Sequence, residues 1–155
     1  MKRIFTILIF LPLLFSPTAS AADLCPLVTE LNRALMESTD YQPAACPKLG
    51  FSTLDADAAV RSQAGAFYPD SGRIELAPDL DLGSAYGQSF LLHEMVHAAQ
   101  FAARADARAR CPAALEAEAY AVQAQFLLEA GLARDALLTR MIGDQLGRCG
   151  AQPDY

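Results

Sequence analysis

The segment "SFLLHEMVHAAQF", from Ser89 to Phe101, is one of the most apolar in the chain and carries its only two histidines. His93 and His97 stand four residues apart, and Glu94 directly follows the first of them. This apolar run, with Ser84 before it as an N-cap, predicts a helix. On a helix, residues four apart share one face. The segment therefore predicts a core helix that presents two imidazoles to one point in space.

The order His93-Glu94-Met95-Val96-His97 is the HExxH arrangement of zinc sites. Imidazole nitrogens bind zinc, and a carboxylate beside the first histidine can take a proton from a water on the metal. The motif implies that zinc acidifies the water, that Glu94 accepts the proton, and that the hydroxide attacks a carbonyl group. The alternative is a pair of core histidines without metal, but burying imidazoles is costly unless something pairs with them. We expect zinc, with His93 and His97 as ligands and Glu94 as the catalytic base.

A third ligand is expected from an acidic residue, because no histidine remains and the cysteines favour disulfides. The segment "LEAEAYAVQAQF" supplies Glu116 and Glu118, which lie 19 and 21 residues after His97. Residues two apart on a helix point about 200° away from each other, so only one of them can face the metal. This reasoning alone leaves both glutamates as candidates.

HExxH followed about twenty residues later by a helical glutamate resembles the gluzincin branch of the zincin metallopeptidases, and the chain also resembles small exported bacterial HExxH proteins. In several gluzincins the ligand opens an E-x-x-A-[D/N] pattern, which Glu116 to Tyr120 matches except at its last position. The resemblance favours Glu116 over Glu118 and implies a peptidase. It is close from His93 to Gln123, and it implies that the preceding strand, Arg73 to Leu76, aligns extended substrates.

Three interpretations of the function follow from these residues. Structural zinc sites are closed by four protein ligands, whereas catalytic sites keep one position open for water. The sequence offers three protein ligands: His93, His97 and Glu116. It therefore favours a zinc-dependent hydrolase that acts on a peptide or protein substrate. The alternatives are a zinc-binding module whose metal stabilises the fold or a protein contact, and a disulfide-rich interaction domain without metal. Tyrosines that can stabilise an oxyanion, which the sequence does not rank, are Tyr68, Tyr86 and Tyr120.

The amino-terminal residues are typical of a secretory signal. A basic start precedes an apolar run from Ile4 to Phe15, and the small residues Ala19-Ser20-Ala21 predict cleavage before Ala22. An uncleaved membrane anchor is the alternative, but the run is about twelve residues and a spanning helix needs roughly 20. We expect a signal peptide at 1–21 and a single exported, periplasmic or secreted zincin-like domain at 22–155, with no stable membrane insertion after cleavage.

Four cysteines remain after cleavage: Cys25, Cys46, Cys111 and Cys149. An even number in an exported chain favours two disulfides, for which three connectivities exist. A zinc cluster is the alternative, but no pair has the CxxC spacing. Two helices, Pro112 to Glu129 and Ala133 to Leu146, are joined by a short link and should be antiparallel. The preferred pairs are therefore Cys111–Cys149 and Cys25–Cys46.

The charge of the predicted mature chain excludes some partners. Without residues 1–21 it has 10 basic and 18 acidic residues. Nucleic acid requires a positive surface, and anionic lipid head groups attract basic rather than acidic proteins. We therefore expect no nucleic-acid partner.

The remaining segments indicate an α+β fold. A helix is expected at Pro26 to Ser38, a loop at Gln42 to Ser52, and two strands at Ala66 to Tyr68 and Arg73 to Leu76. This short hairpin or sheet should pack on the active-site helix, next to the carboxy-terminal helical pair, as a minimal zincin-like fold. The last helix has an apolar face formed by Leu137, Leu138, Met141, Ile142 and Leu146.

Overall fold

The computed structural model describes residues 24–43, 45–52 and 64–150. In these residues four helices and three strands confirm the α+β class. The elements in chain order are α1 (Cys25–Ser38), β1 (Lys48–Phe51), β2 (Gly65–Tyr68), β3 (Arg73–Leu76), α2 (Ala85–Ala102), α3 (Pro112–Glu129) and α4 (Ala133–Leu146). The predicted signal peptide and its cleavage site lie outside the described residues.

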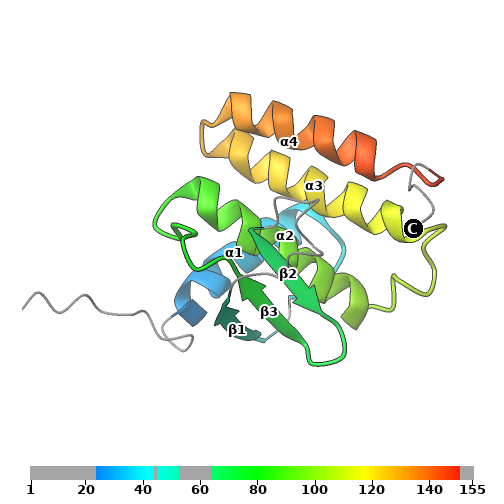
Figure 1. Cartoon of the computed structure of the whole chain (residues 1–155), viewed down its shortest axis with the longest axis horizontal. Coiled ribbons are helices and arrows are strands. Elements are labelled where there is room, and N and C mark those ends of the chain that lie inside the picture. Colours follow the sequence, from blue (N-terminus) through cyan, green and yellow to red (C-terminus); the bar gives the residue numbers. More distant parts are fainter. Residues whose placement is uncertain (1–23, 44, 53–63, 151–155) are drawn as a thin grey trace, which may run out of the picture.

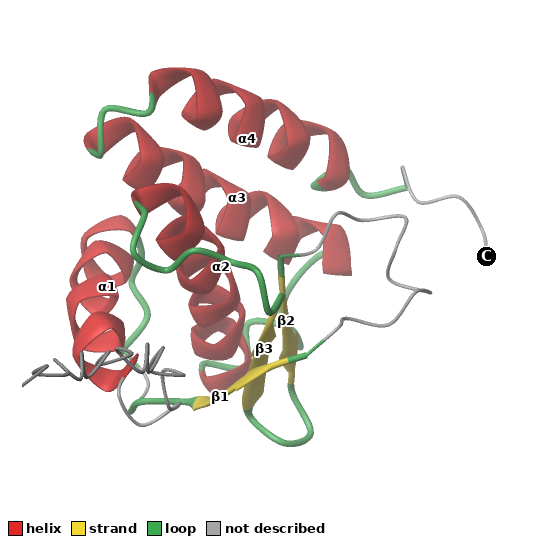
Figure 2. Ribbon diagram, turned by 60° about the vertical axis from the view of Figure 1, so that its left-hand side comes forward, coloured by secondary structure: helices red, strands yellow, loops and turns green. Residues whose placement is uncertain are grey.

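Helix α2 is the central element of the fold. The sheet packs on one side of α2 and α3 on another, with α4 outside α3 and α1 against both α2 and α3 (Figures 1 and 2). The predicted cap is confirmed, because the Ser84 hydroxyl accepts a hydrogen bond from the Gly87 backbone N–H at 3.0 Å. The helix that carries both histidines is therefore held from several directions.

The sheet has the strand order β1-β3-β2, with β1 parallel and β2 antiparallel to β3. The predicted hairpin between β2 and β3 is confirmed, and its turn ends at Gly72, whose φ is +63°. Strand β1 corrects the prediction of a loop over these residues. Its Gly50 faces the Glu75 side chain so closely that an added Cβ would lie 2.8 Å from the carboxylate oxygen Oε1. A larger residue would have to displace this carboxylate, so a glycine suits the position, and it weakens the local strand pattern.

The core joins α1, the sheet, α2 and α3. Full burial of one aliphatic side chain stabilises the fold by about 1.5–3 kcal/mol. Because α2 lies in the middle of this core, four of its polar residues are buried as well: Ser89, His93, Glu94 and Gln100. The buried aliphatic residues include Val28, Leu31, Leu35, Ile74, Leu76, Leu91, Leu92 and Val96.

Helices α3 and α4 pack through small residues. The buried side of α4 consists of Ala136, Thr139 and Gly143. A Cβ at Gly143 would lie 2.5 Å from Cβ of Tyr120, which shows how closely the two helices approach. The predicted apolar face of α4 therefore does not serve this contact. It is exposed: Leu137 by 60%, Leu138 by 48%, Met141 by 59%, Ile142 by 47% and Leu146 by 42%.

Two disulfides confirm the preferred pairing, Cys25–Cys46 and Cys111–Cys149. Disulfides of this kind persist in oxidising compartments, so they indicate an extracellular or otherwise oxidising environment. Among the described helices, none is both long and apolar enough to cross a membrane.

Candidate metal centre

Three of the predicted site residues converge at one point between α2 and α3. The Nε2 atoms of His93 and His97 are 3.1 Å apart, and the Glu116 carboxylate lies 3.5 Å from the first and 3.6 Å from the second. Ligand atoms bound at 2.0–2.1 Å to a tetrahedral ion lie about 3.3 Å from one another. The spacing of these three groups thus fits a metal ion such as zinc.

A chain of hydrogen bonds determines which nitrogen of His93 faces the cluster. The Ser89 hydroxyl donates to the Tyr86 carbonyl oxygen at 2.7 Å, so its oxygen is left to accept from the Gln123 amide nitrogen at 3.1 Å. The Gln123 amide oxygen then faces Nδ1 of His93 at 3.1 Å. Since an amide oxygen only accepts, Nδ1 must carry the proton. Nε2 of His93 is therefore free to bind an ion.

A second glutamine does the same for His97. The Gln100 amide nitrogen donates to the Leu115 carbonyl oxygen at 3.0 Å and to the Glu118 carboxylate at 2.8 Å. Both partners are acceptors, so the Gln100 amide oxygen is the atom that faces Nδ1 of His97, at 2.9 Å. Nδ1 of His97 donates to it, and Nε2 is left with its lone pair.

The two lone pairs and a carboxylate therefore meet without a positive charge between them. Burial alone would raise the pKa of Glu116, but its contacts with His93 and His97 hold that pKa well below its usual range. Burial would lower the pKa of His97, but its contact with Glu116 and the charge of that carboxylate raise it. The cluster is thus a point of negative potential that favours a cation, either a proton or a metal ion.

Glu94 lies in a buried position between α2 and β2. Its side chain touches Gly65, where an added Cβ would lie 2.8 Å from the glutamate Cγ. Burial raises the pKa of Glu94, and it outweighs the charges of His93 and His97 and a hydrogen bond from the Phe67 backbone, which all lower it. Glu94 is outside the three-residue cluster, and its carboxyl group is suited to holding a proton.

Of the two candidate glutamates on α3, Glu116 is the one beside the histidines. The Glu118 carboxylate instead accepts hydrogen bonds from the Tyr41 hydroxyl and the Gln100 amide, both at 2.8 Å. Burial and this contact raise the pKa of Tyr41 to about 12. Glu118 therefore connects the segment after α1 to the glutamine that orients His97.

The strand next to Glu94 is β2, which corrects the expectation that Arg73 to Leu76 borders the site. That segment is β3, and both of its edges are paired, with β1 on one side and β2 on the other. Among the described strands β2 lies at the edge of the sheet, and its residues Gly65 and Phe67 contact Glu94. The sequence identified the hairpin, but the strand order within the sheet depends on β1, which it missed.

One aromatic ring contacts the cluster, and two more lie along the helix face that carries the histidines. The Tyr120 ring lies against the His93 ring with centroids 4.4 Å apart. Along α2, at 100° per residue, Tyr86 and Phe90 share the face that carries His93 and His97, and their rings are 5.1 Å apart. Tyr86 is 49% exposed, so this aromatic pair is open to solvent at the beginning of α2.

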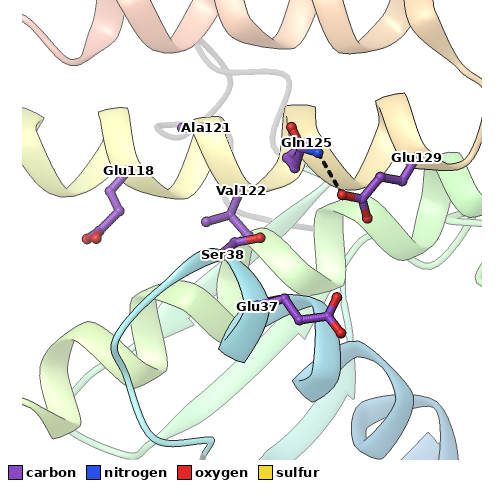
Figure 3. Close-up of a pocket in the computed structure, with 7 residues that line it drawn as sticks. All are labelled: Glu37, Ser38, Glu118, Ala121, Val122, Gln125 and Glu129. Atoms are coloured by element: carbon purple, nitrogen blue, oxygen red, sulfur yellow. Dashed lines mark hydrogen bonds between the residues drawn. The ribbon is translucent and has the colours of Figure 1, made fainter.

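A pocket of about 320 Å³ lies on the other side of α3 and is separate from the cluster. At 100° per residue, the α3 residues that line it point away from the Glu116 side of the helix. Figure 3 shows the pocket, including the hydrogen bond from Gln125 to Glu129 at 2.6 Å. Three of its seven lining residues are glutamates, and none is a histidine: Glu37, Ser38, Glu118, Ala121, Val122, Gln125 and Glu129.

Sequence reasoning missed Gln100 and Gln123, the two residues that orient the histidines. Gln100 follows His97 by three positions and Gln123 follows Glu116 by seven, so each shares a helix face with a predicted ligand. That spacing was the available signal. It is weak, because glutamines on solvated helix faces are common.

Comparison with known proteins places the chain in a family. Residues 20–142 match the family described as Domain of unknown function (DUF6647), so the chain belongs to that family. Neither a curated protein nor a solved structure matches the chain.

Proposed function

We propose that this member of the DUF6647 family is a zinc-dependent hydrolase, and specifically an exported peptidase, with His93, His97 and Glu116 as the metal ligands. The observation that carries the proposal is the direction of the two imidazoles. Gln123 and Gln100 hold both Nδ1 atoms as donors, so both Nε2 lone pairs point to the Glu116 carboxylate. Partners that fix the tautomer in this way are typical of histidines that bind metals.

Zinc is the metal that suits this ligand set. Two imidazoles and one carboxylate are ligands that zinc accepts, and a site with three protein ligands keeps a position open for water and substrate. Within the described residues the cluster contains these three groups and no fourth. A structural zinc would be expected to have four, so the ligand count supports catalysis over a purely structural module.

Glu94 is the residue that we assign to proton transfer. A zinc ion bound at the cluster would supply a Lewis acid that acidifies water and polarises a carbonyl oxygen. Burial raises the pKa of Glu94, so its carboxyl group can take a proton from the attacking water and keep it long enough to deliver it to the leaving nitrogen. The hydrogen bond from the Phe67 backbone orients the carboxylate for this role.

The surroundings of the site support an extended peptide as the substrate. β2 is an edge strand, and among the described residues only β3 pairs with it. Such an edge offers backbone groups to an added strand. Tyr86 and Phe90 share the helix face of the histidines at the beginning of α2, and Phe101, whose ring lies 5.6 Å from that of Phe67, is near the end of α2. We therefore propose peptides with large apolar side chains near the cleaved bond.

The oxidising environment indicated by the two disulfides, and the predicted signal peptide, support the exported location. An exported peptidase would act on proteins outside the cytoplasm. The acidic balance of the chain makes basic rather than acidic substrates the better electrostatic match.

Metal content is the first test of the proposal. Elemental analysis of the purified protein should find about one zinc per chain in the wild type, as a single cluster predicts. His97→Ala should lose the zinc, and Glu116→Gln should bind it more weakly, whereas Glu129→Gln, at an exposed glutamate further along α3, serves as the matched control and should retain it. If the wild type takes up no zinc even when the metal is supplied, the proposal is wrong.

Turnover is the second test, and it separates the hydrolase from a zinc-binding module. A library of peptides with varied apolar residues is incubated with the wild type and with Glu94→Gln. Both proteins should contain zinc, and only the wild type should cleave, because glutamine cannot accept the proton. Equal cleavage by the variant would remove Glu94 from the mechanism, and zinc without any cleavage would support the binding module.

A further inference from the structure

Among the described residues, the outer face of α4 carries five exposed large aliphatic side chains. We use this name for the exposed residues Leu137, Leu138, Met141, Ile142 and Leu146. At 100° per residue the first four are centred opposite Ala136, Thr139 and Gly143, which pack on α3, and Leu146 lies at the edge of the face, near the direction of Thr139. Soluble monomers rarely expose a contiguous strip of large aliphatic side chains. The strip therefore needs a partner.

Charged residues at the two ends of this face indicate what that partner is. Arg134 lies near the beginning of α4 and Asp144 near its end, and both are exposed. Neither takes part in an ion pair within the described part of the chain. When two copies of one helix pack antiparallel about a two-fold axis, each residue before the axis faces a residue equally far beyond it.

An axis near residue 139 satisfies the charges and places two of the apolar residues, Leu137 and Met141, at the centre of the contact. Arg134 and Asp144 each lie five positions from 139, so Arg134 of one copy faces Asp144 of the other, and symmetry makes two such pairs. Leu137 and Met141 each lie two positions from 139, so they meet at the centre. A parallel arrangement would place like charges opposite each other.

From this complementarity we infer that the outer face of α4 is the contact surface of an antiparallel homodimer. Helix α4 lies on the far side of α3 from α2 and the sheet, so the metal centre stays open in both copies (Figures 1 and 2). The inference is therefore independent of the proposed function.

The size of the contact sets the expected strength. Helix α4 has 14 residues and is about 21 Å long. Two such helices bury an area at the low end of specific interfaces, below about 1,200 Å² in total. We therefore expect a reversible dimer with a dissociation constant on the order of micromolar.

Sedimentation equilibrium of the full mature chain, from about 1 to about 500 μM, tests this inference. The wild type should change from monomer to dimer across this range, and Met141→Asp should remain monomeric. Arg134→Asp and Asp144→Arg should each weaken the dimer about tenfold, whereas the double variant should recover most of the wild-type affinity because the pairs are re-formed with opposite sign.

Arg33→Asp, an exposed charge reversal on α1, is the matched control and should leave the dimer unchanged. All the substituted residues are exposed, and circular dichroism checks that each variant is folded. A wild type that is monomeric throughout the range would overturn the inference, as would a dimer that tolerates Met141→Asp. A monomer that binds phosphatidylcholine vesicles through this face would also overturn it and would assign the face to a membrane surface.

Discussion

Two glutamine amides determine what the histidines of this site can do. Gln123 accepts the Nδ1 proton of His93 and donates one amide proton to the Ser89 hydroxyl, so the orientation of the amide is fixed at both ends. A leucine in its place has a similar volume but accepts nothing. The His93 ring would then lose the partner that selects its tautomer.

Gln123→Leu should therefore weaken zinc binding about 10- to 100-fold, the usual effect of losing a hydrogen-bond partner of a metal ligand. Competition with a chromophoric chelator measures this affinity. Gln125→Leu is the control, since Gln125 is exposed and bonds only Glu129 in the described structure. Equal affinities for the two variants would show that the orientation of His93 does not depend on the amide.

Gly65 is the second residue whose size matters. An added Cβ would lie 2.8 Å from Cγ of Glu94 and 3.2 Å from a methyl group of Leu76. Gly65→Ala should therefore lower the free energy of unfolding by about 1–3 kcal/mol through overpacking. Urea unfolding measures the loss. In a Glu94→Ala background only the longer contact with Leu76 remains, so the same substitution should cost clearly less, and equal costs would contradict the contact with Glu94.

At the scale of elements, α3 and α4 pack so closely that a glycine-to-alanine substitution on α4 is expected to lower the free energy of unfolding instead of raising it. Glycine to alanine inside a helix normally stabilises it by up to about 1 kcal/mol. At Gly143 the added methyl would lie 2.5 Å from Cβ of Tyr120, an atom near the backbone that cannot rotate away. Gly143→Ala should therefore destabilise the protein by about 1–3 kcal/mol in thermal or urea unfolding. A stabilised variant would mean that the two helices lie further apart.

Local signals made most of the elements predictable. The Ser84 cap, Pro112 in the first turn and Gly131 after the third helix mark boundaries that the structure confirms. Strand β1 has no such signal, because its pairing with β3 is non-local. The Glu75 side chain also occupies the space beside Gly50, and that contact cannot be read from the residues around Gly50. Likewise, the periodicity of the sequence identified the apolar face of α4. It did not show that the smaller residues on the opposite side of the helix would pack on α3.

The candidate site was likewise predictable where local spacing determines it, and not where the packing of two helices does. The shared helix face of His93 and His97 could be predicted because it follows from helix geometry alone. The choice of Glu116 over Glu118 rested on a resemblance, and the structure places Glu116 beside both histidines. The roles of Gln100 and Gln123 were not predictable, since they depend on how α2 and α3 meet.

At the scale of the whole molecule, the disulfides hold the ends of the site-bearing elements. Cys111 is the N-cap residue of α3, five positions before Glu116, and its bridge to Cys149 closes a loop of 38 residues. Chain entropy predicts that this bridge contributes about 4 kcal/mol and the Cys25–Cys46 bridge, with a separation of 21, about 3 kcal/mol.

Replacing Cys111 and Cys149 together with serine should lower the free energy of unfolding by up to about 4 kcal/mol and should also weaken zinc binding. The matched pair of serines at Cys25 and Cys46 should cost nearly as much stability but leave zinc affinity closer to that of the wild type, because neither cysteine adjoins a ligand-bearing segment. Chemical denaturation and chelator competition on both variants make the comparison. An equal loss of affinity would show that the metal centre responds only to global stability.

The amide partners of His93 and His97 also bear on how the protein would obtain the proposed zinc ion. A carboxylate in their place would draw the Nδ1 proton towards itself and make each imidazole a stronger electron donor. A neutral amide does so less, and it keeps the same charge at any acidity met outside a cell. We therefore expect moderate affinity and ready exchange, so that the fraction of molecules carrying zinc would follow the supply of the ion in the surroundings.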